Sequence, residues 1–169
     1  MAILDIIEMP DERLREQSAP VTVFDEALQG QVGDLFDTLG ETGGIGLSAP
    51  QAGISKRIIL VNVPDDDYGA QLYINPEVIS KSTPRFVEES CLSVPGIEGN
   101  VVRATRLKVR AQNLDGESFE LDVDGMHAVC VQHELDHLEG VLFIDLLSWF
   151  KKLRLKIAAK RNAREAQAA

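Results

Sequence analysis

The sequence predicts an α+β fold: antiparallel sheets packed around a central metal-binding helix, with an N-terminal helix and a C-terminal helix. Three observations support this prediction. Helical periodicity appears in three separate stretches, strand-like segments fill the middle of the chain, and His133 and His137 lie within the second helical stretch. At 169 residues the chain suits one hydrophobic core, and we treat residues 1–169 as a single domain.

The first helix is predicted just after the N-terminal segment. Apolar residues recur there at helical spacing between Phe24 and Leu39, and the glycine pair at 43 and 44 ends the run. A glycine-rich loop, "GGIGLSAPQAG", follows. Residues 57–63, "RIILVNV", are short and rich in β-branched side chains, which is typical of a buried strand.

The second half of the chain predicts more strands and then two helices. "QLYINP" and "EVISKS" are two strand candidates with Pro76 between them, and "RLKVRAQNLDGESFELDV" predicts a hairpin around Asp115 and Gly116. A buried helix is predicted from about residue 124 to 139, where Gly140 ends it. A last helix is predicted from about residue 148 to 167.

The charge of the chain is unevenly distributed. Its net charge is −10, but the tail from Lys151 onward carries +6, which leaves −16 for the body. An acidic body argues against binding of free nucleic acid. The tail is either a solvated helix face or a docking helix for an acidic partner such as ribosomal RNA. Its basic residues are Lys151, Lys152, Arg154, Lys156, Lys160, Arg161 and Arg164, against one acid, Glu165.

The composition also bears on location. No apolar run approaches the ~20 residues of a membrane span, so we expect no membrane association. The start, "MAILDIIEMP", lacks the basic lead of a signal peptide, and we expect a cytoplasmic protein. In that compartment the two cysteines are expected to be thiols or ligands, not a disulfide.

The stretch "CVQHELDHLEG" indicates a metal site. His133 and His137 are four residues apart and so project from one helix face about 6 Å apart, where they can share a cation. Glu134 is placed to take a proton from metal-bound water. The alternative, two unrelated surface histidines, is disfavoured because the surroundings are apolar and an unpaired buried glutamate is costly.

A third ligand is needed, and the common zinc-protease patterns do not supply it. The longer H-E-x-x-H pattern requires a histidine where this chain has Phe143, and a downstream glutamate ligand would have to be Glu165 in the basic tail. His127 lies six residues before His133, on another side of the helix, which suggests a surface or structural residue.

Two cysteines remain as candidates for that ligand. Cys130 sits in "AVCVQ", where a cysteine is most often a small core residue. Cys91 lies in "VEESCLSVPG", a segment closed by Pro95 and Gly96, which can bring a thiolate in from outside the helix. Chemistry favours Cys91 over Cys130 without excluding either. A thiolate with two imidazoles leaves the fourth position open, as a catalytic metal requires.

Three separated stretches resemble, in order and spacing, the motifs of the peptide deformylase family. They are "GIGLSAPQ" at residues 44–51, "ESCLS" at 89–93 and "QHELDH" at 132–137. "MPDERLR" near the start and the hairpin before the last motif look like the same family, so the resemblance covers essentially the whole chain. It implies a single catalytic domain that removes the formyl group from N-formylmethionyl nascent peptides and releases formate.

The resemblance also implies a role for each site residue. The metal ligands would be Cys91, His133 and His137, and Glu134 would be the general acid/base. The side-chain amide of Gln51 and the backbone N–H of Leu92 would stabilise the oxyanion. The substrate-binding residues would be Ile45, Gly46, Glu89, Val129 and Cys130, with a methionine pocket that includes Ile45, Val129 and Cys130. In the family the metal is typically Fe²⁺, which zinc, nickel or cobalt can replace.

The chain departs from the family pattern near the second motif. Ser90 stands where the family usually has glycine, which would strain the ligand loop if that position needs a positive φ. Glu98 stands where many relatives carry a basic or aromatic residue, and Val102 where many carry proline. These changes leave the metal chemistry intact and bear on substrate preference.

Two alternatives to a formylmethionine hydrolase follow. One is a related amidohydrolase with a shifted N-acyl preference, which Ser90 and Glu98 motivate. The other is a non-catalytic formyl-peptide-binding module with a structural metal. The presence of Glu134 and Gln51 argues against the second, because a structural site needs neither.

Overall fold

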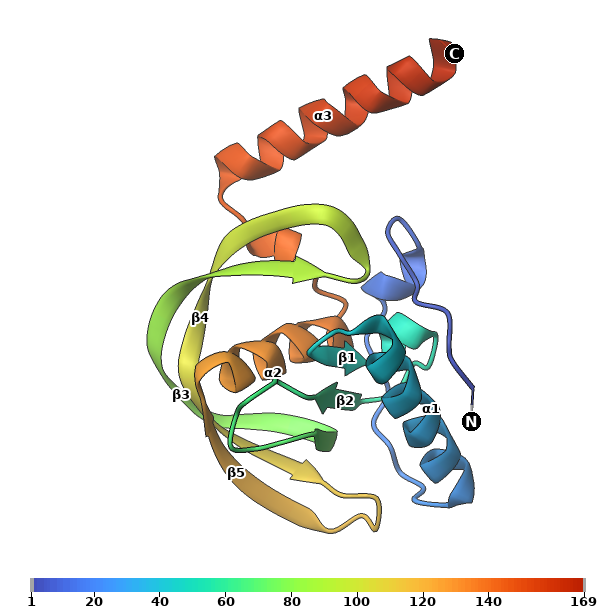
Figure 1. Cartoon of the computed structure of the whole chain (residues 1–169), viewed down its shortest axis with the longest axis vertical. Coiled ribbons are helices and arrows are strands. Elements are labelled where there is room, and N and C mark those ends of the chain that lie inside the picture. Colours follow the sequence, from blue (N-terminus) through green and yellow to red (C-terminus); the bar gives the residue numbers. More distant parts are fainter. Residues whose placement is uncertain (1, 169) are drawn as a thin grey trace.

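A computed structural model describes residues 2–168, except for the side chains of residues 162, 163 and 165–168. The side chain of Glu165 therefore lies outside the described part. One antiparallel sheet with the order β1-β2-β3-β4-β5 curls around helix α2, as Figure 1 shows. Its strands are β1 Gly46–Ser48, β2 Ile58–Val61, β3 Gln71–Cys91, β4 Val94–Gln112 and β5 Ser118–Asp124. The helices are α1 Glu26–Thr42, α2 Gly125–Leu138 and α3 Trp149–Ala168, with 3-10 turns η1 Glu12–Arg15, η2 Ala49–Ala52 and η3 Phe143–Leu146. The predicted α+β fold with a central helix is confirmed.

The ends of the helices follow from capping chemistry. Asp25 caps α1 by accepting a hydrogen bond from the backbone N–H of Leu28 at 3.0 Å. Gly43 follows α1 with a φ of 66°, a left-handed conformation that glycine adopts without strain. Gly140, two residues after α2, has a φ of 70°. Both glycine stops predicted from the sequence are confirmed.

The long strand β3 corrects one expectation. "QLYINP" and "EVISKS" are not two strands but parts of one strand that passes through Pro76. The pairing with β4 shifts register between Ile74 and Glu77, and Asn75 takes a positive φ of 50° at that irregularity. Pro76 lacks an N–H, and the bulge allows it to sit in the strand without breaking a ladder bond.

Strand β2 separates the two halves of the core, because all four of its residues are fully buried. Ile59 and Val61 pack with residues of α2 in one apolar cluster, whereas Ile58 and Leu60 pack with α1 in another. Alternation along a strand sends successive side chains to opposite faces. The continuous apolar run therefore reflects a strand covered by a helix on each side, with α2 held inside the sheet.

Helix α3 projects away from the rest of the molecule (Figure 1). Large apolar side chains of this helix are exposed: Phe150 is 73% and Ile157 59% exposed, and Trp149 at its start is 67% exposed. The helix is attached through Leu147, which is buried just before it, and through Leu155, which packs against the same apolar cluster. Among the described helices, none is long and apolar enough to cross a membrane.

We expect Gly140→Ala to destabilise the protein by at least about 2 kcal/mol. A positive φ costs an alanine roughly 1–2 kcal/mol, and the added Cβ would also lie 2.3 Å from the carbonyl oxygen of Arg15, which must move. Gly30→Ala in α1 is the matched control, because nothing lies within 4 Å of its added Cβ. Because alanine has the higher helix propensity, this control should raise the free energy of unfolding by roughly 0.5–1 kcal/mol. Urea unfolding measures both, and equal stability of the two variants would contradict the assignment of Gly140 as a required glycine.

Candidate metal centre

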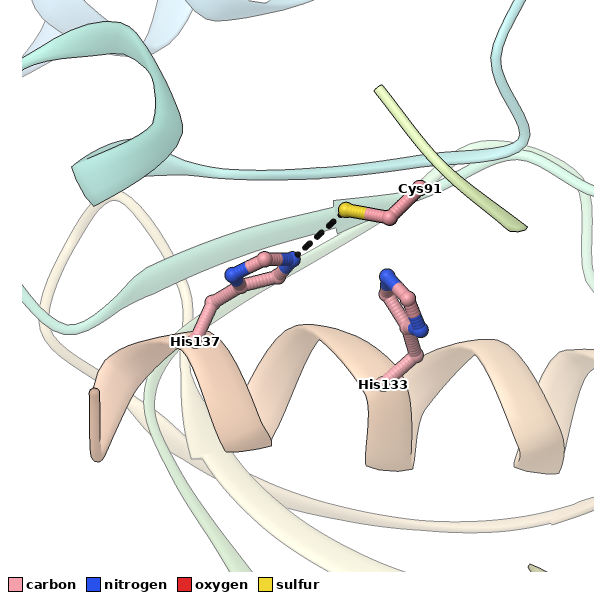
Figure 2. A group of neighbouring side chains, drawn as sticks. All are labelled: Cys91, His133 and His137. Carbon is pink, nitrogen blue, oxygen red and sulfur yellow. Dashed lines mark hydrogen bonds between the residues drawn. The ribbon is translucent and has the colours of Figure 1, made fainter. Parts of the chain in front are cut away.

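Three potential ligands meet at one point of the structure. One side-chain atom each from Cys91, His133 and His137 lies within 4.8 Å of the other two. Figure 2 shows both imidazoles projecting from one face of α2, while Cys91 approaches from the opposite side. The sulfur of Cys91 is 3.3 Å from Nε2 of His137. Cys130 is not part of this group, since its sulfur instead contacts the carbonyl oxygen of Ile45 at 3.5 Å.

The hydrogen bonds around these residues suit a bound cation. Nδ1 of His133 lies 2.8 Å from a carboxylate oxygen of Glu89, which leaves its Nε2 available as a ligand. In the described part of the chain, two buried atoms here have no hydrogen-bond partner: Nδ1 of His137 and Oε2 of Glu134. One thiolate and two imidazoles form a donor set for zinc, iron or a similar divalent metal. The residues therefore fit the metal that the sequence predicts.

A buried ion-pair network holds His133 in place. Arg103 of β4 donates to both carboxylate oxygens of Glu89 at 2.7 and 3.1 Å, and to Asp136 at 2.7 Å. Burial by itself would raise the pKa of Glu89, but hydrogen bonds from His133 and Arg103 outweigh it and lower the pKa to about 2. Glu89 is therefore an anion that accepts the Nδ1–H of His133 and orients its ring.

This network was only partly foreseen. The family resemblance implies that Glu89 is a substrate-binding residue, and Glu89 does line the cleft. Its carboxylate, however, is occupied by His133 and Arg103. Arg103 and Asp136 were not predicted at all, because an arginine in a strand and an aspartate in a helix are usually exposed, whereas Arg103 is only 5% exposed.

Glu134 is the candidate base. Its side chain is buried beside the ligand histidines, and burial raises its pKa to about 7, since a low-dielectric environment disfavours the charged form. A carboxyl group that titrates near neutrality can both accept and return a proton. An added Cβ on Gly46 would lie 2.5 Å from Oε1 of Glu134, so a larger residue at position 46 would displace the base.

Gln51 is held with its amide nitrogen toward the ligand thiolate. Its Oε1 accepts hydrogen bonds from the backbone N–H of Ser48 at 2.9 Å and from the Ser48 hydroxyl at 2.8 Å. These bonds fix the amide orientation, so that Nε2 donates toward the sulfur of Cys91 at 3.6 Å and toward the Ser93 hydroxyl at 3.2 Å. A donor is thus held next to the potential metal ligands, where the family resemblance implies an oxyanion.

A cleft of about 560 Å³ opens onto these groups. One wall is the loop from Gly44 to Gly46 and the other is the end of β3, while α2 contributes the floor. The predicted residues that line it are Ile45, Gly46, Gln51, Glu89, Cys91, Leu92, Val129, Cys130, His133 and Glu134. Met126 also lines it and was missed, because its position at the start of the helix gave no signal of a pocket.

Two remaining expectations are settled by the same geometry. His127 is fully buried, with its ring between the hydroxyl of Tyr73 at 2.8 Å and the carboxylate of Asp66 at 2.7 Å. The structural interpretation of His127 is therefore right and the surface interpretation is wrong. Ser90 is not among the described non-glycine residues with positive φ, so serine causes no backbone strain there.

Comparison with known proteins identifies the family. Residues 3–153 match the family model described as polypeptide deformylase. The chain belongs to the peptide deformylase family. It is 46% identical over 165 residues to a peptide deformylase of Chromobacterium violaceum, covering 98% of this chain and 99% of that one. It is 43% identical to one of Neisseria meningitidis, with 96% and 97% covered.

The fold agrees with that membership. The crystal structure of a peptide deformylase from Legionella pneumophila superposes with a TM-score of 0.87 at 40% identity, covering 99% of each chain. The protein is thus a hydrolase of the deformylase family, and its α+β architecture is that of the family.

For this deformylase we expect Arg103→Met to weaken both folding and metal binding. The change leaves two carboxylates, Glu89 and Asp136, without their buried partner. We expect this loss to lower the free energy of unfolding by roughly 3–5 kcal/mol. Loss of the group that orients Glu89 should lower metal affinity by about 10- to 100-fold. Urea unfolding and competition with a metal chelator measure the two effects. Arg110→Met, which removes an exposed pair with Glu120, is the control and should change neither; equal metal affinity for both variants would contradict the orienting role.

Proposed function

We propose that this protein hydrolyses the N-formyl group of N-terminal formylmethionine on newly synthesised polypeptides and releases formate. The observation that carries the proposal is the convergence of Glu134, Gln51 and three metal-binding side chains on one cleft, in a chain of the peptide deformylase family. A divalent ion held by Cys91, His133 and His137 would polarise the formyl carbonyl and lower the pKa of water.

The side chains around the cleft supply the remaining chemistry. Glu134 takes a proton from the attacking water and later delivers it to the departing amine, a double role that its pKa of about 7 suits at neutral pH. Attack places negative charge on the former carbonyl oxygen. The amide of Gln51 and the backbone N–H of Leu92 are the donors for that charge, each worth about 3–4 kcal/mol in the transition state.

The peptide binds in extended form along the cleft. Strand β1 is at the edge of the sheet, so backbone groups of Gly46 are available to pair with an added strand, whereas the carbonyl of Ile45 accepts the N–H of Asn62. The methionine side chain enters the pocket formed with Val129 and Cys130 of α2. We infer Fe²⁺ as the metal, with zinc, nickel or cobalt as functional substitutes, because the family typically uses iron; the mixed sulfur and nitrogen donors fit each of these metals. Because the substrate is a nascent chain, we place the protein in the cytoplasm.

Formate release from formyl-Met-Ala-Ser tests this function. Protein prepared anaerobically with iron should release formate, and Glu134→Ala should lower kcat by at least about 100-fold, because a general acid/base typically contributes that much. The control is metal content, which should be equal in both proteins. Faster hydrolysis of acetylated peptides or free formyl-amino acids would favour the shifted N-acyl preference. Tight peptide binding without formate release would instead favour the non-catalytic module.

We further propose that α3 docks the enzyme on ribosomal RNA. The helix projects from the body (Figure 1) and carries basic residues that include the exposed Arg154, Lys156 and Lys160. Its exposed aromatic residues, Trp149 and Phe150, lie at the base of the helix. A phosphate backbone attracts clustered lysine and arginine, and the rest of the chain is too acidic to bind nucleic acid without such a segment.

Charge neutralisation in α3 tests the docking. The triple variant Arg154→Gln, Lys156→Gln, Lys160→Gln should bind ribosomes more weakly and with a shallower salt dependence, since each lost phosphate contact reduces the slope by about 0.7–0.9. Hydrolysis of short peptides should not change. The matched control neutralises three exposed basic residues on β3 and β4, Lys81, Arg85 and Arg106. Equal loss of ribosome binding in both triple variants would contradict a specific role for α3.

A further inference from the structure

The exposed face at the end of β3 is acidic where it borders the cleft. Glu88 and Ser90 lie two apart in the strand and so point to the same side, and both are exposed. In the ladder Ser90 pairs with Glu98 of β4, which places the Glu98 side chain on the same face. Glu88 and Ser90 also line the cleft, as does Glu8 from the N-terminal segment.

These carboxylates lack a cationic neighbour on their own side. Among the side chains that the structure describes, no lysine or arginine lines the cleft, and neither Glu88 nor Glu98 forms an ion pair. The other two acids of the cleft are accounted for, since Glu89 pairs with Arg103 and Glu134 is buried. Lys151 approaches Gly99, but Gly99 is buried and belongs to the opposite face of β4.

Strand geometry sets which substrate residue meets this face. If the methionine side chain enters the pocket beside Val129 and Cys130, it points to the side of the strand where Glu89 and Cys91 also point. The next side chain of an extended peptide points the other way. It therefore lies on the face of Glu88, Ser90 and Glu98, where diagonal neighbours are about 7–8 Å apart and within reach of a long side chain.

We propose that the face formed by Glu88, Ser90 and Glu98 makes this enzyme select formyl peptides with a basic residue after the methionine. The inference rests on the proposed deformylase function and adds a specificity to it. A lysine or arginine at that position is attracted by two carboxylates, whereas a glutamate is repelled by both. The Ser90 hydroxyl between them can hydrogen-bond the incoming side chain.

The test compares three amidated peptides, formyl-Met-Lys-Ala-Ser, formyl-Met-Gln-Ala-Ser and formyl-Met-Glu-Ala-Ser. For the metal-loaded wild type we expect kcat/KM to be at least about tenfold higher with lysine than with glutamate, because unit charges about 6 Å apart give that ratio on reversal of one sign even at the dielectric constant of water. The difference should reside mainly in KM, because the charges act equally before and during bond cleavage. It should shrink between low salt and 0.5 M NaCl as screening increases.

Substitutions assign the effect to the two glutamates. Glu88→Gln with Glu98→Gln should reduce the lysine-to-glutamate ratio to about twofold or less, and Glu88→Lys with Glu98→Lys should reverse it. Glu26→Gln is the control. It removes one exposed acid at the far end of α1, roughly 25 Å along the helix from the cleft loop, and should leave the ratio unchanged.

The outcomes separate this inference from the function on which it rests. If the wild-type enzyme hydrolyses all three peptides with equal kcat/KM, the inference is overturned and the deformylase function stands. A preference that persists unchanged in the double variant would also overturn it. Failure to release formate even from the glutamine peptide would overturn the proposed function, and the inference with it.

Discussion

The ion pair between Arg103 and Glu89 joins the sheet to the metal helix. Arg103 comes from β4 and Glu89 from β3, and through Glu89 the pair reaches His133 on α2. Both side chains are about 95% buried. The charge of the carboxylate is stable there only because the guanidinium is next to it, and the reverse is also true. The arrangement exists only if the hairpin of β3 and β4 meets α2, which follows later in the sequence, and it therefore ties the metal site to the correct pairing of these two strands.

Strand register is the constraint that makes this meeting possible. Glu89 and Cys91 are two residues apart, so both point toward α2, whereas Glu88 and Ser90 point outward. A slip of one residue between β3 and β4 would reverse that assignment and send the ligand thiolate to solvent. The ladder ends with a register shift at Cys91, which pairs with Val94 rather than continuing the spacing of Ser90 and Glu98. The same alternation that builds the metal centre thus also leaves an acidic face beside the cleft.

Local signals in the sequence predicted much of this architecture. The helical stretches, their glycine stops at 43 and 140 and the hairpin at Gly116 all depend on neighbouring residues, and the structure has them. The continuity of β3 through Pro76 was missed because a bulge is specified by the partner strand and not by the proline itself. The burial of Arg103 and His127 was missed for a similar reason, since it depends on partners in other elements, Glu89 in the neighbouring strand and Asp66 before β3, and not on adjacent residues.

Gly46 shows how narrowly the cleft is built. An added Cβ there would lie 2.4 Å from the sulfur of Cys130 and 2.5 Å from Glu134, so the backbone of the β1 edge approaches the base as closely as a chain can. In the proposed binding mode, a peptide that pairs with this edge would lie next to the carboxyl group without any large movement of α2. The close approach also keeps Glu134 away from solvent, which raises its pKa toward neutrality. Under the proposed function, one missing side chain therefore connects substrate alignment with the proton chemistry of Glu134, and the glycine-rich loop is part of the proposed catalytic site.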